Sequence, residues 1–170
     1  DALGFEIVTI GKGKNNMLNR ASNPDTCAEK AKAKKMSPKM LASFEDGTKT
    51  MVEMTSIGNS TGYVPEVRGA YGPDCTVADL PKVFSTKENG GVFENRGCVD
   101  YAVGVAPGVF IIITTDQEKI QRDLNYLSVS HHGKYWCLYR PYHMANLETP
   151  ITIANVCLDG RETLKIGRKP

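Results

Sequence analysis

The sequence predicts an α+β domain, with a mainly antiparallel sheet of about four strands and helices packed on one face of it. Strand-like segments rich in β-branched residues occur near both ends and as an adjacent pair in the middle, and the helix-like segments are grouped between them. The 170 residues match the size of one domain, and 41% hydrophobic and 24% charged residues are typical of globular proteins. One domain with a substantial core is therefore expected.

The N-terminal part is expected to form a strand and then a helix. The strand is Phe5–Ile10, which stops at a Gly-Lys-Gly-Lys turn. Asp25 or Thr26 can cap a helix that runs to about Met36, because both side chains can accept a hydrogen bond from the first helical turn. The Ser37-Pro38 pair then interrupts this helix.

Three further helical segments are expected before the central strands. The first is Pro38–Ser43 and the second runs from Thr48 to about Asn59, with apolar residues spaced for one buried face. The third, from Thr76 to Phe84, can be capped by Asp74 or by Thr76 itself. Helices thus separate the first strand from the rest of the sheet.

The second half begins with two strong strands, Val99–Val105 and Val109–Thr115. The intervening Ala106-Pro107-Gly108 is a short turn that suits an antiparallel hairpin. Asp116 is placed to cap a helix that ends near Leu127. The remaining elements are a turn at His131-His132-Gly133, a strand over Lys134–Arg140 and an apolar helix over about His143–Leu158, which Pro150 kinks or divides.

Residues 1–158 are expected to form the catalytic, substrate-binding and dimerisation domain. Residues 159–170 are polar and contain glycine, so they are interpreted as a linker toward a missing C-terminal domain.

Composition excludes several classes of partner. The chain has 21 Lys plus Arg and 19 Asp plus Glu, and a net charge of +2 predicts neither a nucleic acid nor a membrane surface as the main partner. The five cysteines form no metal-binding spacing and indicate reduced thiols in a cytoplasmic protein. The chain also lacks the Gly-x-Gly-x-x-Gly and P-loop patterns of nucleotide-binding units.

The segment Gly11-Lys12-Gly13-Lys14-Asn15-Asn16 is the first candidate site. Its glycines allow close approach of the backbone, and Lys12, Lys14, Asn15 and Asn16 supply the donors that a phosphate or carboxylate needs. An ordinary solvated turn explains the segment equally well.

Asp46-Gly47-Thr48-Lys49 is the second candidate. In one interpretation Asp46 or Thr48 caps a helix, and Lys49 with Glu53 is an exposed i,i+4 pair. In the other, Lys49 holds or protonates a substrate oxygen at the helix N-terminus, and Glu53 orients Lys49 or binds a metal. The segment alone favours the first interpretation.

The third candidate is Tyr139-Arg140-Pro141-Tyr142-His143, followed by Glu148. Arg140 can bind an anion through two hydrogen bonds, and His143 titrates near neutral pH, so this set can combine substrate binding with acid/base chemistry. A buried polar network that joins a strand to a helix is the equal alternative.

These three candidates also carry a resemblance to a known family. Together with Val105–Phe110 and Leu147–Pro150, they resemble the central domain of the homoserine-dehydrogenase-like oxidoreductases, which include deoxyxylulose-phosphate reductoisomerase-like enzymes. The resemblance covers nearly the whole chain in the same order.

The resemblance implies a homodimeric enzyme in which a Rossmann domain binds NADPH, this domain binds a small anionic carbonyl substrate, and a SAF-type domain follows. It implies reduction of that carbonyl, with reductive isomerisation of deoxyxylulose phosphate to methylerythritol phosphate as the specific candidate and a divalent metal, Mg or Mn, as a possible cofactor. The alternatives are reduction of a homoserine-type aldehyde and a non-catalytic module for oligomerisation and anion sensing. The implied catalytic residues are Lys49, Glu53 and His143, the implied substrate-binding residues are Lys12, Lys14, Asn15, Asn16, Arg140 and Tyr142, and the metal-ligand candidates are Asp46, Glu53 and Glu148.

Overall fold

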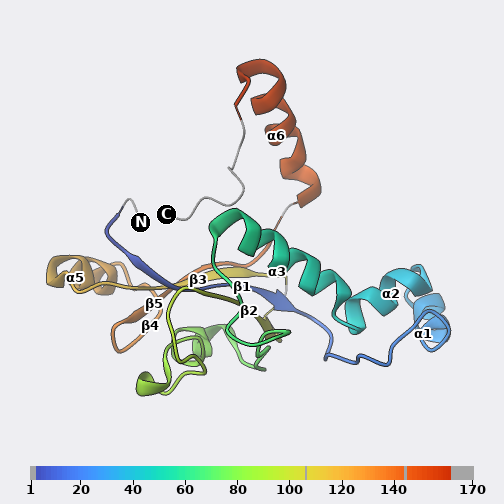
Figure 1. The fold of residues 1–170 in the computed structure, drawn as a ribbon, viewed down its shortest axis with the longest axis horizontal. Helices are drawn as coiled ribbons and strands as arrows, with labels where there is room; N and C mark the ends of the chain where they lie inside the picture. The colour runs from blue at the N-terminus through green and yellow to red at the C-terminus, as the bar shows by residue number, and fades with distance from the viewer. Residues whose placement is uncertain (1–2, 106, 144, 162–170) are drawn as a thin grey trace.

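The computed structural model describes residues 3–105, 107–143 and 145–161, and within them a five-stranded sheet forms the centre of the molecule (Figure 1). Its strand order is β2-β1-β3-β5-β4, with β1 and β2 parallel and the other neighbours antiparallel. The strands are β1 Glu6–Lys14, β2 Cys98–Val103, β3 Val109–Thr114, β4 His131–His132 and β5 Tyr135–Arg140. The predicted α+β class and mainly antiparallel sheet are confirmed, and the additional strand is the short β4, where a turn was expected.

The predicted hairpin between the two central strands is wrong. β1 lies between β2 and β3, because Gly11 pairs with Asp100 on one side and with Phe110 on the other. The segment around Pro107 and Gly108 therefore crosses the end of β1 and does not close a two-stranded ribbon. The N-terminal strand β1 therefore lies between β2 and β3, which the local sequence predicts to be direct neighbours.

The predicted turn at Gly11–Lys14 is wrong for a related reason. These residues continue β1, and the Gly13 N–H donates to the Gly108 carbonyl oxygen at 2.8 Å. Gly11 is needed for packing, because a Cβ atom there would lie 2.3 Å from Cζ of the Phe110 ring. The glycine makes room for an aromatic ring within a regular strand.

We expect Gly11→Ala to lower the free energy of unfolding by about 1–3 kcal/mol, because Phe110 is fully enclosed and cannot withdraw without disturbing its neighbours. Urea denaturation measures the change. The matched control is Gly11→Ala combined with Phe110→Leu, which removes the ring that the methyl group meets. If the two substitutions destabilise additively, the proposed contact is not the cause.

The helices follow the predicted order, with shifts at their ends. The first helix begins at Ala28 and not at the predicted cap, and Gln117 occupies the N-cap position expected for Asp116. Thr76, one of the two expected caps, forms a capping box with Asp79 before a short 3₁₀ turn. The helices are α1 Ala28–Ala33, α2 Pro38–Glu45, α3 Thr48–Thr61, α4 Leu80–Val83, α5 Glu118–Tyr126 and α6 Ala145–Asp159, and the 3₁₀ turns are Val77–Asp79 and Lys87–Asn89.

Helices lie on both faces of the sheet, so the expectation of a single covered face holds only in part. In β2, Tyr101 and Val103 pack with Met54 of α3. Ala102, between them in sequence, packs with Leu80 and Phe84 at α4. Because neighbouring residues of a strand point to opposite faces, α3 and α4 lie on opposite sides of the sheet.

The face that carries α3 also carries α5, at the other end of the sheet. Leu124 of α5 packs against Ile113 of β3 and Trp136 of β5. The register pairs Ile113 with Trp136, so both side chains lie on the same face. Two separate helices thus cover the two ends of this face.

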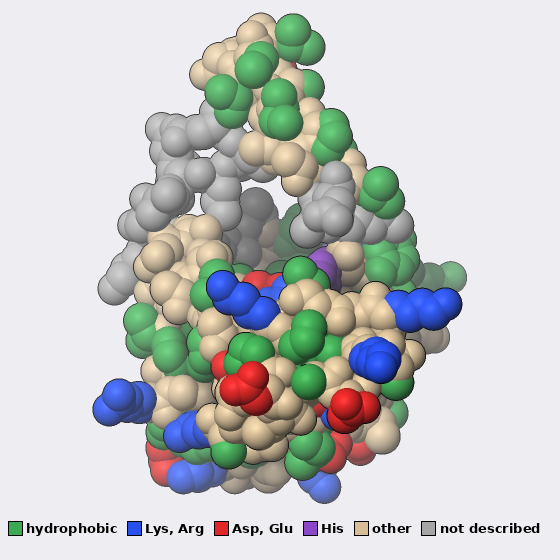
Figure 2. All heavy atoms as spheres, turned by 90° about the vertical axis from the view of Figure 1, so that its right-hand side faces the viewer, with side chains coloured by type: hydrophobic (Ala, Val, Ile, Leu, Met, Phe, Trp, Pro, Cys, Tyr) green, Lys and Arg blue, Asp and Glu red, His purple; other side chains and the backbone are tan. Residues whose placement is uncertain are grey.

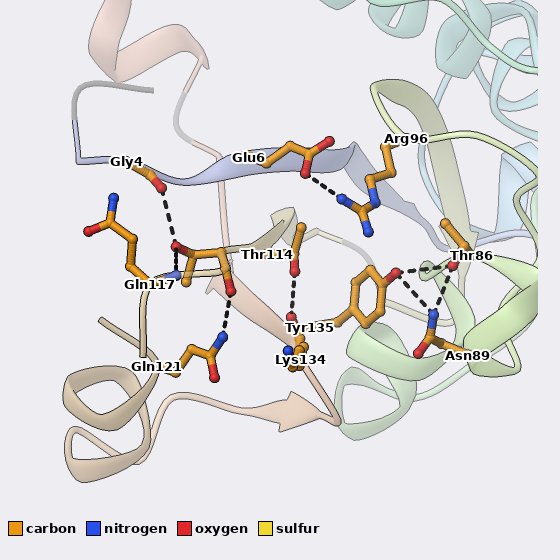
Figure 3. A network of polar contacts seen from close by, with 11 residues as sticks. Gly4, Glu6, Thr86, Asn89, Arg96, Thr114, Gln117, Gln121, Lys134 and Tyr135 are labelled. Carbon is orange, nitrogen blue, oxygen red and sulfur yellow. Dashed lines mark hydrogen bonds and ion pairs between the residues drawn. The ribbon is translucent and has the colours of Figure 1, made fainter. Parts of the chain in front are cut away.

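Polar contacts attach the second face to the loop that follows α4 (Figure 3). The Tyr135 hydroxyl is 3.0 Å from the Thr86 hydroxyl and accepts a hydrogen bond from the Asn89 amide at 3.1 Å. At the neighbouring strand the Thr114 hydroxyl donates to the Lys134 carbonyl at 2.8 Å. These contacts join segments that are distant in sequence.

The last helix, α6, projects from the body of the molecule in Figure 1. Pro150 lies inside this helix, so it does not divide the segment into two helices, which was one of the two expected alternatives. The predicted linker 159–170 lies largely outside the described residues. No helix of the described part of the chain is long and apolar enough to cross a membrane.

Candidate functional site

A polar pocket lies where the C-terminal end of β1 meets the first turn of α3. Its cavity measures about 250 Å³. We call it the lysine pocket, and its lining residues are Lys12, Gly13, Lys14, Asn15, Asn16, Phe44, Lys49, Thr50, Pro107 and His143. Six of the residues predicted for the site thus meet in one cavity, although they come from three separate parts of the sequence.

The geometry of β1 places two of the lysines. Lys12 and Lys14 are two residues apart in the strand, so their side chains point to the same face. Lys12 forms an ion pair with Glu53 of α3, and the Lys14 ammonium donates to the Phe44 carbonyl oxygen at the end of α2. Both lysines are buried and have little freedom to move.

Lys49 enters the pocket from the first turn of α3. Asp46 begins this turn by accepting a hydrogen bond from the Thr48 N–H at 2.7 Å, and Gly47 takes the left-handed conformation that the turn needs, with φ of 89°. The Lys49 ammonium lies 4.6 Å from the centre of the Phe44 ring. The expected helical pair of Lys49 with Glu53 is replaced by the pair of Glu53 with Lys12.

The pocket lowers the pKa values of Lys12, Lys14 and His143. Burial, together with the charges of Lys49 and Lys14, lowers the pKa of Lys12 to about 8. Burial also lowers the pKa of Lys14, and burial followed by the charges of Lys12 and Lys49 lowers that of His143. His143 is therefore neutral at physiological pH, while Lys12 is protonated but close to its titration point.

Two predicted substrate-binding residues lie outside the lysine pocket. Arg140 donates to Glu148 of α6, with 2.7 Å between Nη2 and Oε1, and its guanidinium lies 4.9 Å from the centre of the Tyr142 ring. The charge of Arg140 contributes to lowering the pKa of His143, so it acts on the pocket electrostatically. Arg140 and Tyr142 form an exposed cluster next to the site.

The candidate metal ligands do not form a common site. Asp46 accepts from the backbone of α3, Glu53 pairs with Lys12, and Glu148 pairs with Arg140. Within the described residues, no group of three or more His, Cys, Asp or Glu side chains could hold a metal ion. A pocket lined by three lysines is matched to an anion, so these residues do not fit a divalent cation.

Sequence reasoning missed a second polar cavity on the other side of the α3 N-terminus. It measures about 520 Å³ and is lined by Arg20 and Arg68 together with Asp46 and Gly47. Neither arginine belongs to a recognisable motif, and only the fold brings them together. Phe44, Thr50 and Pro107 of the lysine pocket were missed for the same reason.

Comparison with known proteins agrees with a catalytic role for this domain. No curated protein matches the sequence. A family model described as the catalytic domain of oxidoreductase DRL matches residues 1–149, which is most of the chain and includes every lining residue of the lysine pocket. The chain therefore belongs to the DRL oxidoreductase family and comprises its catalytic domain.

Proposed function

We propose that the lysine pocket binds a small phosphorylated carbonyl compound and holds its carbonyl group for reduction by NAD(P)H. The observation that supports this most directly is the convergence of Lys12, Lys14, Lys49 and His143 on one cavity of about 250 Å³. Glu53 balances the charge of Lys12, so two ammonium charges remain around this small space and a doubly charged anion balances them. A phosphate ester supplies that charge, whereas an aldehyde with one carboxylate leaves excess positive charge.

The phosphate end is assigned to Lys14, Asn15 and Asn16. Lys14 is fixed to the Phe44 carbonyl, so its remaining N–H groups can donate to an anion without further ordering of the side chain. The two asparagines follow directly at the end of β1 and add neutral donors. Lys49 completes the positive field from the first turn of α3.

The proton for the reduced carbonyl oxygen is assigned to Lys12. When hydride adds to a carbonyl carbon, the oxygen gains negative charge and must take up one proton. An ammonium group with a pKa of about 8 releases a proton far more readily than an ordinary lysine. Neutral His143 can accept or donate a hydrogen bond to a neighbouring substrate hydroxyl.

Bound NAD(P)H would supply the hydride. No dinucleotide-binding fingerprint occurs in this sequence, so we assign cofactor binding to a separate Rossmann domain of the full enzyme. We derive no step through a metal ion, because the carboxylates proposed as its ligands are engaged elsewhere.

Deoxyxylulose phosphate is the specific substrate that we propose. Its carbon skeleton would first rearrange, with no change in redox state, to a branched aldehyde phosphate, and addition of hydride and one proton to that aldehyde would give methylerythritol phosphate. Binding can be tested on the 170-residue chain by calorimetry with deoxyxylulose phosphate and with unphosphorylated deoxyxylulose. We expect loss of the phosphate, or Lys14→Ala, to weaken binding by about 10- to 100-fold, the effect of one or two charge-assisted hydrogen bonds. The matched control is Lys39→Ala, an exposed lysine of α2 outside the pocket.

Turnover requires the full-length enzyme, assayed as NADPH oxidation with deoxyxylulose phosphate in the presence of Mn²⁺ or of a chelator. Oxidation of NADPH with conversion to methylerythritol phosphate supports the proposal. NADPH oxidation with a homoserine-type aldehyde but not with deoxyxylulose phosphate would mean that such an aldehyde is the substrate. Tight binding of inorganic phosphate without any NADPH oxidation would indicate an anion sensor.

A further inference from the structure

The second polar cavity, beside the α3 N-terminus, takes no part in the proposed reaction. It measures about 520 Å³, and Arg20, Arg68 and Asp46 supply its charged side chains. The Arg20 guanidinium lies beside Gly69, where a Cβ atom would be 3.5 Å from Nη2. The cavity shares no lining residue with the lysine pocket, so the two arginines form a separate concentration of positive charge.

The charges of these arginines are not balanced by the surrounding chain. Within residues 3–105, 107–143 and 145–161, neither guanidinium forms an ion pair with a carboxylate. The neighbouring acids are engaged, because Glu45 pairs with Lys30 and Glu66 accepts hydrogen bonds from the loop before β2. Two positive charges and the one carboxylate in the lining leave a single positive charge, which a monoanion balances.

The positive charge is local and does not belong to a broad basic surface. In Figure 2, Lys and Arg side chains are dispersed among Asp and Glu over the face that carries α1 and α2. Nucleic acids and other polyanions bind to extended stretches of basic side chains. The arginine cavity therefore suits a small anion.

An apolar cavity adjoins the arginines and follows α3. It measures about 280 Å³ and shares Met51 and Gly69 with the arginine cavity. Met54 of α3 lines it on one side, and Val64 and Ala70 line it on the other. We call the two cavities together the arginine groove. One end of this groove is cationic and the other end is apolar.

The walls of the arginine groove are held in place by the fold. One wall is α3, and the other is the loop of residues 63–72. Asp100 fixes this loop to β2 by accepting hydrogen bonds from the N–H groups of Tyr71 and Gly72 at 2.9 Å each. The same anchoring holds Ala70 in the left-handed conformation, with φ of 60°, which residues with a Cβ atom rarely adopt. A wall that is already ordered reduces the entropy lost when a ligand binds.

We propose that the arginine groove binds a small carboxylate that carries an apolar tail. The carboxylate accepts hydrogen bonds from Arg20 and Arg68, because a guanidinium matches the geometry of a carboxylate with two parallel donors. The tail lies against Met51 and Met54, whose flexible side chains adapt to tails of different shape. This site does not rest on the proposed reaction, since none of its residues lines the lysine pocket.

Amide NMR of the 170-residue chain tests the site and locates the ligand. The probe is hexanoate, while acetate supplies the carboxylate without the tail and hexanol supplies the tail without the charge. We expect hexanoate to shift the amide signals of Gly47, Gly69 and Ala70, with a dissociation constant on the order of 1 mM for a ligand of this size. Acetate and hexanol should each bind at least about tenfold more weakly.

Substitutions at the two ends of the groove test the two parts of the ligand. Arg20→Gln or Arg68→Gln should weaken hexanoate binding by about 10- to 100-fold, while Arg122→Gln, at an exposed arginine of α5, is the matched control. Val64→Asp should weaken binding at least about tenfold, because it sets a carboxylate beside the tail. Val52→Asp, at a similarly exposed position of α3 outside the groove, should leave binding unchanged.

Three results would overturn the proposal. The first is the absence of any amide shift at about 20 mM hexanoate. The second is equal binding of hexanol, since the arginines would then contribute nothing. The third is a set of shifts confined to Gly13 and Asn15 and abolished by Lys14→Ala, which would place the carboxylate in the lysine pocket.

Discussion

Replacing Lys12 with methionine is expected to lower kcat/KM for carbonyl reduction by about 1,000-fold, which corresponds to about 4 kcal/mol of transition-state stabilisation. Methionine preserves the unbranched side chain except for the terminal ammonium group, and it can neither donate a proton nor hold positive charge near the carbonyl oxygen. The measurement is steady-state NADPH oxidation by the full-length enzyme. Circular dichroism and the melting temperature show whether the fold survives.

The pH dependence separates a proton donor from a purely structural lysine. Lys12 must be protonated to act as the acid, so wild-type kcat/KM should be constant below pH 8 and fall tenfold per unit above the pKa of about 8. Glu53→Gln removes the negative charge paired with Lys12, so it should lower this pKa further and move the decline to lower pH.

Lys12→Met combined with Glu53→Gln is the control for the unpaired carboxylate that Lys12→Met alone leaves behind. If activity returns in the double variant, the loss in the single variant came from that carboxylate and not from the missing proton. A pH profile of the wild type that stays flat to pH 10 would contradict the assignment of Lys12 as the acid.

The largest effect on stability is expected from Asp100→Ala, at about 3–5 kcal/mol of unfolding free energy. The Asp100 carboxylate is fully buried and accepts three backbone N–H groups, from Tyr71 and Gly72 at 2.9 Å each and from Tyr101 at 2.7 Å. Alanine leaves these donors buried without acceptors. The loop before β2 would lose its attachment to the sheet.

Urea denaturation measures the loss of unfolding free energy in Asp100→Ala. Two further variants show whether the lost hydrogen bonds are its cause. Asp100→Asn keeps one acceptor oxygen but sets an NH₂ group against a backbone N–H, so it should cost less than alanine and still be clearly destabilising. Asp116→Ala removes an exposed carboxylate beyond β3 and should change stability by less than about 0.5 kcal/mol. Equal stability of Asp100→Ala and the wild type would mean that the loop finds other acceptors.

Local signals were enough to predict most of the longer elements, although not β4 or the extension of β1 to Lys14. α3 begins at Thr48 as expected, because Asp46 and Gly47 specify a helix start through their own side-chain and backbone chemistry. The convergence of Lys12, Lys49 and His143 could be anticipated because strand ends and helix starts commonly carry site residues, and the structure brings these three together.

Pairings between distant segments could not be predicted in the same way. The Pro107-Gly108 turn has the composition of a hairpin, yet β1 lies between β2 and β3, where Gly11 accepts the Phe110 ring at close range. Likewise, nothing near Arg140 in the sequence shows whether its side chain faces the pocket or Glu148. The choice depends on where α6 begins in space.

The central place of β1 also sets a condition on how the chain folds during synthesis. Residue 14 ends β1, but its second neighbour is complete only at residue 114, a delay of about 5–20 s at typical ribosomal rates. β1 has two unpaired edges until residue 103 completes β2, and one until residue 114 completes β3, and such edges can pair with other chains. Lys12 and Lys14 place two charges within β1, so we expect the same lysines that line the pocket to oppose such pairing in the growing chain.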